Sequence, residues 1–201
     1  AVLSLVESHP LGAWVCSVNG ALVANHIPFF LDRARGPLGT LVGHVARANS
    51  IWRDLGATTT PSVVMFLGPQ SYITPGWYPG KQEHGKVVPT WNYVAAHVHG
   101  VARAISDRHW LLEMLNRLTG FHEARRPAPW RVADAPPEYI DKLLGAIVGI
   151  EIPIERLEGK LKASQDEDRQ DRYGTMEGLE DGGHPEQRAM AELVRKTLTS
   201  G

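Results

Sequence analysis

Glycine and proline interrupt the first 90 residues of the chain so often that no long helix fits between them. The 201-residue chain holds 20 glycines and 14 prolines. Short apolar segments bounded by such residues are typical of short β-strands. Asn19-Gly20 stands between two of these segments, at 11–18 and 21–26. Asn-Gly favours the tight turn of a β-hairpin, because both central turn residues need a positive φ. The sequence therefore predicts an antiparallel meander at the start of the chain.

Later segments carry further strand patterns. Residues 93–105 alternate between two faces, which predicts a long strand. A second hairpin is expected where two apolar segments flank a turn at 32–37. We expect Gly68-Pro69 to interrupt one strand, with 72–73 as a short continuation, and Pro153 to end the last strand. The further strands predicted in this way are 29–31, 38–44, 61–67 and 146–152.

The second half of the chain changes to helical patterns, with apolar residues at helical spacing. Ser106 and Asp134 are good N-cap residues. Gly120 and Gly145 are typical of helix ends. The polar segment 164–183 carries charges of both signs and is expected to be exposed or loosely ordered. Strands followed by helices predict an α+β fold, mainly β, built on a small antiparallel barrel. The predicted helices are 45–55, 106–120, 134–145 and 185–199.

Charge and cysteine content exclude several classes of protein. With 21 basic and 22 acidic residues, the formal charge is -1, so the chain lacks the basic balance of a strong DNA or anionic-membrane binder. The single cysteine, Cys16, excludes an intrachain disulfide framework and fits a cytoplasmic protein. We expect no membrane span, since no apolar segment reaches ~18 residues. We also expect no signal peptide, because the start lacks a basic region.

Common catalytic and nucleotide-binding motifs are missing. The sequence holds no G-x-G-x-x-G, no G-x-x-x-x-G-K-[ST] and no G-x-S-x-G, which removes the usual dinucleotide, nucleoside-triphosphate and serine-hydrolase sites. His97 and His99 point to one face of the long predicted strand, where His26 or His44 could complete a metal site. Imidazoles on a half-buried strand more often pair with neighbours, so no metal is predicted. Cys16 is expected to be a core thiol.

Two kinds of segment carry groups suited to a ligand. Residues 43–49 run from a strand into a helix and offer backbone amides and Arg47 to a phosphate. An exposed arginine at a helix start is the simpler alternative. Segments 68–78 and 88–93 place Trp and Tyr rings beside amide and hydroxyl groups, an arrangement that suits a flat heteroaromatic ligand. A loop anchored by aromatic residues would give the same pattern.

Several of these segments occur in an order that is typical of one family. They are N-H-I-P, G-H-V-A-R-A-N, F-L-G-P-Q-S-Y-I-T-P-G-W-Y, V-P-T-W-N-Y with H-V-H-G after it, and a late K-A-S-Q. Together they resemble the FMN-binding negative transcriptional regulators, the PaiB-like family, over about residues 11–178. The resemblance implies a split β-barrel of the pyridoxamine-phosphate-oxidase-like kind. It also implies a homodimer with FMN at the subunit interface.

The resemblance further implies which residues hold FMN. The strand that carries Asn25 would lie along the flavin ring, and the turn that carries Arg47 would hold the phosphate. The start of the long strand would come from the other subunit. The late segment reads K-A-S-Q-D where the family has K-L-S-Q-N, and Asp166 would repel a nearby phosphate. The implied cofactor-binding residues are Asn25, His26, Ile27, His44, Arg47, Ala48, Asn49, Trp91, Asn92, Lys162, Ser164 and Gln165.

The function implied by the resemblance is flavin-dependent negative regulation of transcription. The near-neutral charge and the lack of a basic recognition helix predict that any DNA binding is weak, salt-sensitive or dependent on a partner. Two alternatives stay open: an FMN-dependent oxidoreductase acting on a small molecule, and a haem-binding or haem-degrading split barrel. No residue stands out as a catalytic base, so no catalytic residue is assigned. We expect one FMN-binding domain at 1–160, with a C-terminal segment at 161–201 that belongs to it.

Overall fold

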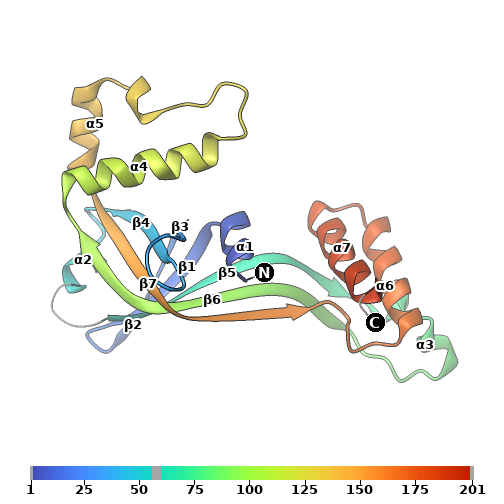
Figure 1. The fold of residues 1–201 in the computed structure, drawn as a ribbon. Coiled ribbons are helices and arrows are strands. Elements are labelled where there is room, and N and C mark those ends of the chain that lie inside the picture. The colour runs from blue at the N-terminus through green and yellow to red at the C-terminus, as the bar shows by residue number, and fades with distance from the viewer. Residues whose placement is uncertain (1, 56–59, 200–201) are drawn as a thin grey trace. The chain divides into compact units, whose positions relative to one another are not determined.

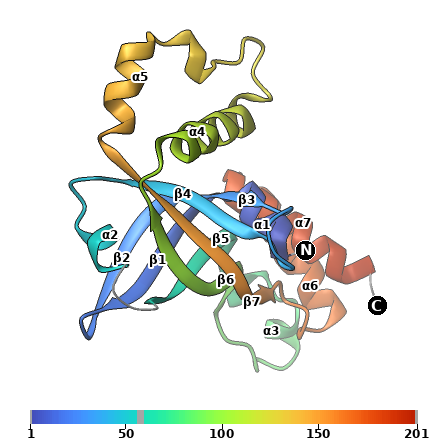
Figure 2. The ribbon, with the colours of Figure 1, turned by 60° about the vertical axis from the view of Figure 1, so that its left-hand side comes forward.

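The computed structural model describes residues 2–55 and 60–199, and within them seven strands form one sheet in the order β2-β1-β5-β6-β7-β4-β3. β1 pairs antiparallel with β2 and β5, and β4 pairs antiparallel with β3 and β7. The predicted antiparallel α+β fold is therefore confirmed (Figures 1 and 2). The strands are β1 (Leu11–Val18), β2 (Ala21–Pro28), β3 (Phe30–Asp32), β4 (Thr40–Ala46), β5 (Thr60–Ile73), β6 (Thr90–Ile105) and β7 (Ile147–Lys162).

Helices lie before, between and after the strands. None of those in the described residues is at once long and apolar enough to cross a membrane. The α-helices are α1 (Val2–Ser8), α2 (Ile51–Asp54), α3 (Gly80–Glu83), α4 (Arg108–Glu123), α5 (Pro137–Leu144), α6 (Arg169–Asp181) and α7 (Pro185–Thr199). Two short 3-10 helices are also present: η1 (Pro75–Trp77) lies between β5 and α3, and η2 (Val132–Asp134) lies between α4 and α5.

The two predicted hairpins are present. In the first, Asn19 has a φ of 51° and Gly20 a φ of 79°, and Val18 pairs with Ala21 across the turn. Only residues that tolerate a positive φ fit both positions, which is why the Asn-Gly signal was reliable. In the second, β3 pairs with β4 from Phe30↔Val42 to Asp32↔Thr40.

Two compact units share the chain. One comprises residues 1–66 and 97–158, and the other comprises residues 67–96 and 159–201. We call them the first and the second unit. β5, β6 and β7 each contribute residues to both. These ranges differ from the division at residue 160 that was expected, because segment 67–96 groups with the C-terminal helices.

The first unit has an apolar core that its helices α4 and α5 extend. Trp14, Phe29 and Phe66 are fully buried within it, and the rings of Phe29 and Phe66 meet edge to face at 6.2 Å. α4 buries its apolar stripe against β4 and α5, which explains why the helical spacing was visible in the sequence. That stripe consists of Leu111, Met114 and Leu118, packed with Val42 and Leu144.

Three strand and helix boundaries differ from the sequence prediction. β5 runs through Gly68-Pro69 to Ile73, and its alternation of buried and exposed residues changes phase just after that pair. β7 runs through Pro153, which pairs with Thr40 at the last position of the β4 ladder, where a missing N–H costs least. The helix expected at 45–55 is wrong: β4 stays paired with β7 as far as Ala46, and only α2 is helical.

The helix termini also differ from the sequence prediction. Asp107, not Ser106, caps α4 by accepting from the Trp110 amide, and α4 continues past Gly120. Asp134 lies in η2, so α5 begins three residues later than predicted, at Pro137, although Gly145 does end it. Segment 164–183, expected to be loose, contains α6. The sequence pattern concealed that helix because two of its three buried residues, Asp171 and Thr175, are polar; the third is Leu179.

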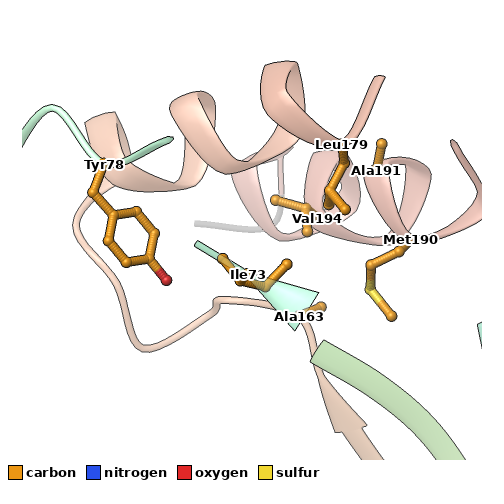
Figure 3. Close-up of a cluster of buried hydrophobic side chains, with 7 residues drawn as sticks. All are labelled: Ile73, Tyr78, Ala163, Leu179, Met190, Ala191 and Val194. Carbon is orange, nitrogen blue, oxygen red and sulfur yellow. The ribbon is translucent and has the colours of Figure 1, made fainter. Parts of the chain in front are cut away.

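The second unit has its own apolar core, beneath α6 and α7 (Figure 3). α7 was predicted from its apolar stripe, and Met190, Ala191 and Val194 on that stripe are buried. Leu179 of α6, Ile73 at the end of β5, Tyr78 and Ala163 complete the cluster. These contacts give the second unit a core of the kind that a compact region needs to hold its shape.

Trp77 packs directly against two glycines of α6. A Cβ atom on Gly174 would lie 2.0 Å from the Trp77 carbonyl oxygen, and one on Gly178 would lie 2.3 Å from the Trp77 ring. The Gly-x-x-x-Gly spacing places both on one face of the helix. The aromatic segment that ends in G-W-Y is therefore held by α6.

Gly149 and Gly120 give a paired test of the packing around α4, which contains both Trp110 and Gly120. A Cβ at Gly149 would lie 2.2 Å from the Trp110 ring, whereas Gly120, inside α4, has nothing within 4 Å. We expect Gly149→Ala to lower the free energy of unfolding by about 1–3 kcal/mol through overpacking. We expect Gly120→Ala to raise it by about 0.5–1 kcal/mol, because alanine favours a helix interior. Denaturant unfolding measures both. A loss of stability in Gly120→Ala would contradict the continuation of α4 past that residue.

Candidate functional site

The turn after β4 is fastened to the segment between α5 and β7 by Arg47. Its Nε donates to the Gly145 carbonyl at 2.8 Å and its Nη2 to the Ile147 carbonyl at 2.9 Å. The Arg47 amide donates to the Ala146 carbonyl at 2.7 Å. These three bonds fix the direction of the guanidinium group. Its Nη1 has no hydrogen-bond partner in the described part of the chain, so it keeps N–H groups for a ligand.

Trp52 holds this arginine from the other side. Its indole Nε1 donates to the Arg47 carbonyl at 3.0 Å. The guanidinium of Arg47 lies 5.5 Å from the Trp52 ring centroid, and that of Arg53 lies 5.2 Å from it. Such cation–π contacts limit the conformations of an otherwise flexible side chain. Trp52 was not among the site residues expected from the sequence. Its position five residues after Arg47 was the one sequence feature that could have indicated a contact between them.

Two asparagines join β2 to the same turn. Asn49 Nδ2 donates to Asn25 Oδ1 at 2.7 Å, and Asn49 Oδ1 accepts from the Ile51 amide at 3.1 Å. His26 is exposed, Ile27 is buried and Ala48 is exposed. The structure therefore brings together the residues of the predicted site that lie in β2, β4 and this turn. We call these seven residues the turn group: Asn25, His26, Ile27, His44, Arg47, Ala48 and Asn49.

Two buried polar atoms of the turn group have no partner in the described residues. They are Asn25 Nδ2 and His44 Nδ1. Burial lowers the pKa of His44, which favours its neutral form. Unpaired buried polar atoms are costly, so a polar ligand bound beside these two would satisfy them; four further such atoms lie elsewhere in the described residues, and it is the position of these two beside Arg47 that fits a ligand. Together with the free N–H groups of Arg47, they fit a ligand that carries both a phosphate and polar ring atoms.

The other five predicted site residues lie in the second unit. Asn92 is fully buried; its Nδ2 donates to Ser164 Oγ at 2.8 Å, and its Oδ1 accepts from the Ser164 amide at 3.2 Å. This pair helps to hold Ser164 at a φ of 55°, which is uncommon for a residue other than glycine. Lys162 Nζ donates to Thr90 Oγ1. The late K-A-S-Q segment is thus bonded directly to the V-P-T-W-N-Y segment.

Gln165 bonds within its own segment. Its Oε1 accepts from the Ala163 amide at 2.6 Å, and its Nε2 donates to the Leu161 carbonyl at 2.8 Å. Of the five residues, Trp91 is the one with a largely exposed ring, 54% accessible, in edge-to-face contact with Tyr72. The amide and hydroxyl groups of this set therefore hold the two segments together, and Trp91 is left facing solvent.

The histidines of β6 lie beside a charged pair. His99 Nε2 lies 3.2 Å from Glu158 Oε2, and Arg156 Nη2 lies 3.1 Å from His99 Nδ1. His97 Nδ1 lies 3.8 Å from the same Glu158 oxygen. Burial, with the neighbouring Arg156 charge, lowers the pKa of His99. Across residues 2–55 and 60–199, no group of three or more His, Cys, Asp or Glu side chains is arranged to hold a metal ion.

Comparisons with known proteins agree on one family. A family model described as "Putative FMN-binding domain" matches residues 1–156. The protein AN0679 of Emericella nidulans is 34% identical over 226 residues, which covers 96% of this chain and 90% of that protein. Protease synthase and sporulation protein PAI 2 of Bacillus subtilis is 29% identical over 197 residues, covering 98% of this chain and 91% of that protein.

The fold is also found among solved structures. The structure of the FAD and heme binding protein from Mycobacterium smegmatis superposes with a TM-score of 0.57 at 21% identity, and covers 79% of this chain and 68% of that chain. At this identity the likeness shows the fold alone. That fold is the split β-barrel expected from the sequence.

The Asn92–Ser164 pair can be tested by a double-mutant cycle. We expect Asn92→Ala to lower the free energy of unfolding by about 1–3 kcal/mol, because it leaves buried groups of Ser164 without partners. Asn92→Ala and Ser164→Ala should show a coupling energy of about 1 kcal/mol in the cycle, measured by denaturant unfolding. As a control, Asn92→Ala combined with Gly120→Ala should be additive. Additive behaviour of the Asn92 and Ser164 substitutions would show that the pair does not brace the two segments.

Proposed function

The chain belongs to the family of FMN-binding domains whose model it matches, and on that premise we propose that its turn group holds FMN. Arg47 and the backbone of the turn would bind the phosphate, and β2 would lie along the flavin ring. The observation that carries this proposal is the set of unsatisfied groups on adjoining elements: the free Nη1 of Arg47, Asn25 Nδ2 and His44 Nδ1.

The phosphate is assigned to Arg47 because of charge and direction. The phosphate of FMN is mostly a dianion at neutral pH, and a guanidinium binds such groups by charge-assisted hydrogen bonds. The two carbonyl contacts and the Trp52 ring already fix the Arg47 side chain, so little further conformational entropy is lost on binding.

The ring is assigned to β2 and β4 because their unpaired atoms suit its polar edge. The flavin ring carries carbonyl oxygens and an N–H group along one edge, and the Asn25 amide can donate to such an oxygen. His44, kept neutral by burial, can accept from an N–H group or donate to a carbonyl, according to its tautomer. Bound FMN supplies redox chemistry, and the residues of the chain bind it and orient it.

The second-unit residues take a different part in this proposal. Asn92, Ser164, Lys162 and Gln165 already use their polar groups within the chain, so we assign them to bracing and not to flavin contacts. A flavin on the turn group would rest on half-buried and exposed side chains, leaving one face open in a single chain. A second copy covering that face is the reason to propose a homodimer. Sedimentation of FMN-loaded protein at twice the 22.1 kDa chain mass would support it.

Within this framework we propose that the chain is a flavin-dependent negative regulator of transcription in the cytoplasm. Support comes from the family resemblance, from a relative named for protease synthesis and sporulation, and from the free Cys16.

FMN-dependent oxidation of a small molecule is the alternative. A haem site has less support, because both ring nitrogens of His99 already face Arg156 or Glu158. An absorption spectrum with flavin bands and no Soret band separates flavin from haem, and promoter-fragment retention with and without FMN tests regulation.

Comparing FMN with riboflavin tests the role of Arg47. We expect Arg47→Ala to weaken FMN binding about thirty- to a hundredfold, equivalent to roughly 2–3 kcal/mol, because the charge-assisted bonds are lost. Riboflavin, which lacks the phosphate, should bind the variant and the parent within about threefold of each other. Fluorescence titration of the two flavins gives both affinities.

Arg53→Ala is the matched control. Arg53 has the same charge and stacks on the same Trp52 ring, but within the described residues its guanidinium makes no carbonyl contacts of the kind that fix Arg47. This variant should bind FMN within about twofold of the parent. If Arg47→Ala weakens FMN and riboflavin equally, the arginine acts on the shape of the turn alone and the phosphate assignment fails.

A further inference from the structure

The second unit contains a groove of its own. It is formed by the end of β5, the η1 segment, the start of β6 and the link between α6 and α7, with a volume of ≈ 750 Å³. A cavity of that size accommodates a small organic molecule. None of the turn group lines it. The side chains on which the argument rests are Tyr72, Trp77, Trp91, His184 and Glu186.

Two exposed aromatic rings meet in this groove as a corner. Tyr72 is 47% exposed and Trp91 54% exposed. Their centroids lie 6.1 Å apart with an interplanar angle of 67°. Parallel rings would form a slot for a flat heteroaromatic ligand, whereas rings at a steep angle present a face and an edge to a compact group. The geometry favours a rounded group over a flat one.

Two hydroxyl groups that line the groove are already hydrogen-bonded within the chain, which argues against their recognising a heteroaromatic ring. Ser71 Oγ donates to the Tyr72 carbonyl at 3.1 Å, and Thr74 Oγ1 accepts from the Gly76 amide at 3.1 Å. These hydroxyl groups are therefore already engaged within the chain, which leaves fewer groups to read the edge of a ring. The sequence expectation of a flat ligand at this segment loses support for that reason.

The charge of the groove completes the argument. Among its described lining residues, Glu186 carries the one carboxylate, and none is Lys or Arg. Glu186 is exposed and has no ion pair in the part of the chain that the structure describes. Electron-rich ring faces in one groove with a carboxylate that makes no ion pair within the described residues attract a cation, and the interaction strengthens when the cation is alkylated and weakly hydrated.

We propose that this groove binds an organic cation, with the ammonium group at the corner of Tyr72 and Trp91 and with Glu186 as its counter-charge. The site is complete within one chain and does not depend on FMN. It would give the protein a binding activity for amine-bearing small molecules in addition to its flavin.

A comparison of choline with 3,3-dimethylbutan-1-ol tests this. The two probes have nearly the same shape, but only choline carries a charge. Binding is followed in the full chain by NMR, through the Gly182 backbone amide and the Trp91 indole N–H. We expect choline to shift both signals, with about tenfold higher affinity than the uncharged alcohol. Equal affinities, or no shift up to about 100 mM choline, would overturn the proposal.

Matched variants locate the cation. Glu186→Gln should weaken choline about three- to tenfold and leave the alcohol unchanged, whereas Glu177→Gln, the same change at an exposed site of α6, should alter neither. Trp91→Phe identifies the indole signal and should weaken choline. Trp130→Phe, which removes another exposed tryptophan, should not weaken it. Equal responses to the two glutamate substitutions would contradict the assigned counter-charge.

FMN itself distinguishes this site from the flavin site. Choline affinity should be the same with and without saturating FMN. Displacement of choline by FMN would show that the groove belongs to the flavin site and would overturn the separate cation site. If FMN does not bind while choline does, the flavin proposal fails and the groove proposal stands.

Discussion

Three long strands place the central constraint on this fold. β5, β6 and β7 have 14, 16 and 16 residues, and each contributes to both compact units. The C-terminal end of β5 buries Ile73 in a second apolar cluster, which α6 and α7 provide. Ala163, directly after β7, joins the same cluster, whereas the last residues of β7 are largely exposed. The helices that follow the barrel in sequence are for that reason part of the strand architecture.

The sequence revealed the elements whose patterns are governed by local chemistry. Asn19-Gly20 marks a turn that few other residue pairs can make, and the stripe of α7 has the period of a helix. Boundaries set by tertiary contacts were not visible. Pro153 continues a strand because its ladder partner ends there, and α6 is helical although it buries Asp171 and Thr175. In both cases a neighbour far along the chain decided the outcome.

The site shows the same division. The sequence placed Arg47 and Asn25 in one site, and Asn49, in the turn that carries Arg47, bonds to Asn25 of β2. It did not reveal that Asn92 and Ser164 bond to each other, because residues 72 positions apart leave no periodic signal. The V-P-T-W-N-Y segment and the late K-A-S-Q segment are thus kept together by mutual hydrogen bonds. A distinctive segment can owe its residues to such bracing as much as to a ligand.

The packing of Trp77 against Gly174 and Gly178 limits where this protein can be truncated. The family match ends at residue 156, inside β7 and ahead of both glycines. A fragment trimmed to the matched length would lose the end of one strand, the helix that holds Trp77 and most of the cluster around Ile73. The end of the family-model match is therefore not a boundary of folding. The segment that carries Trp77 needs the chain beyond residue 156 as a scaffold.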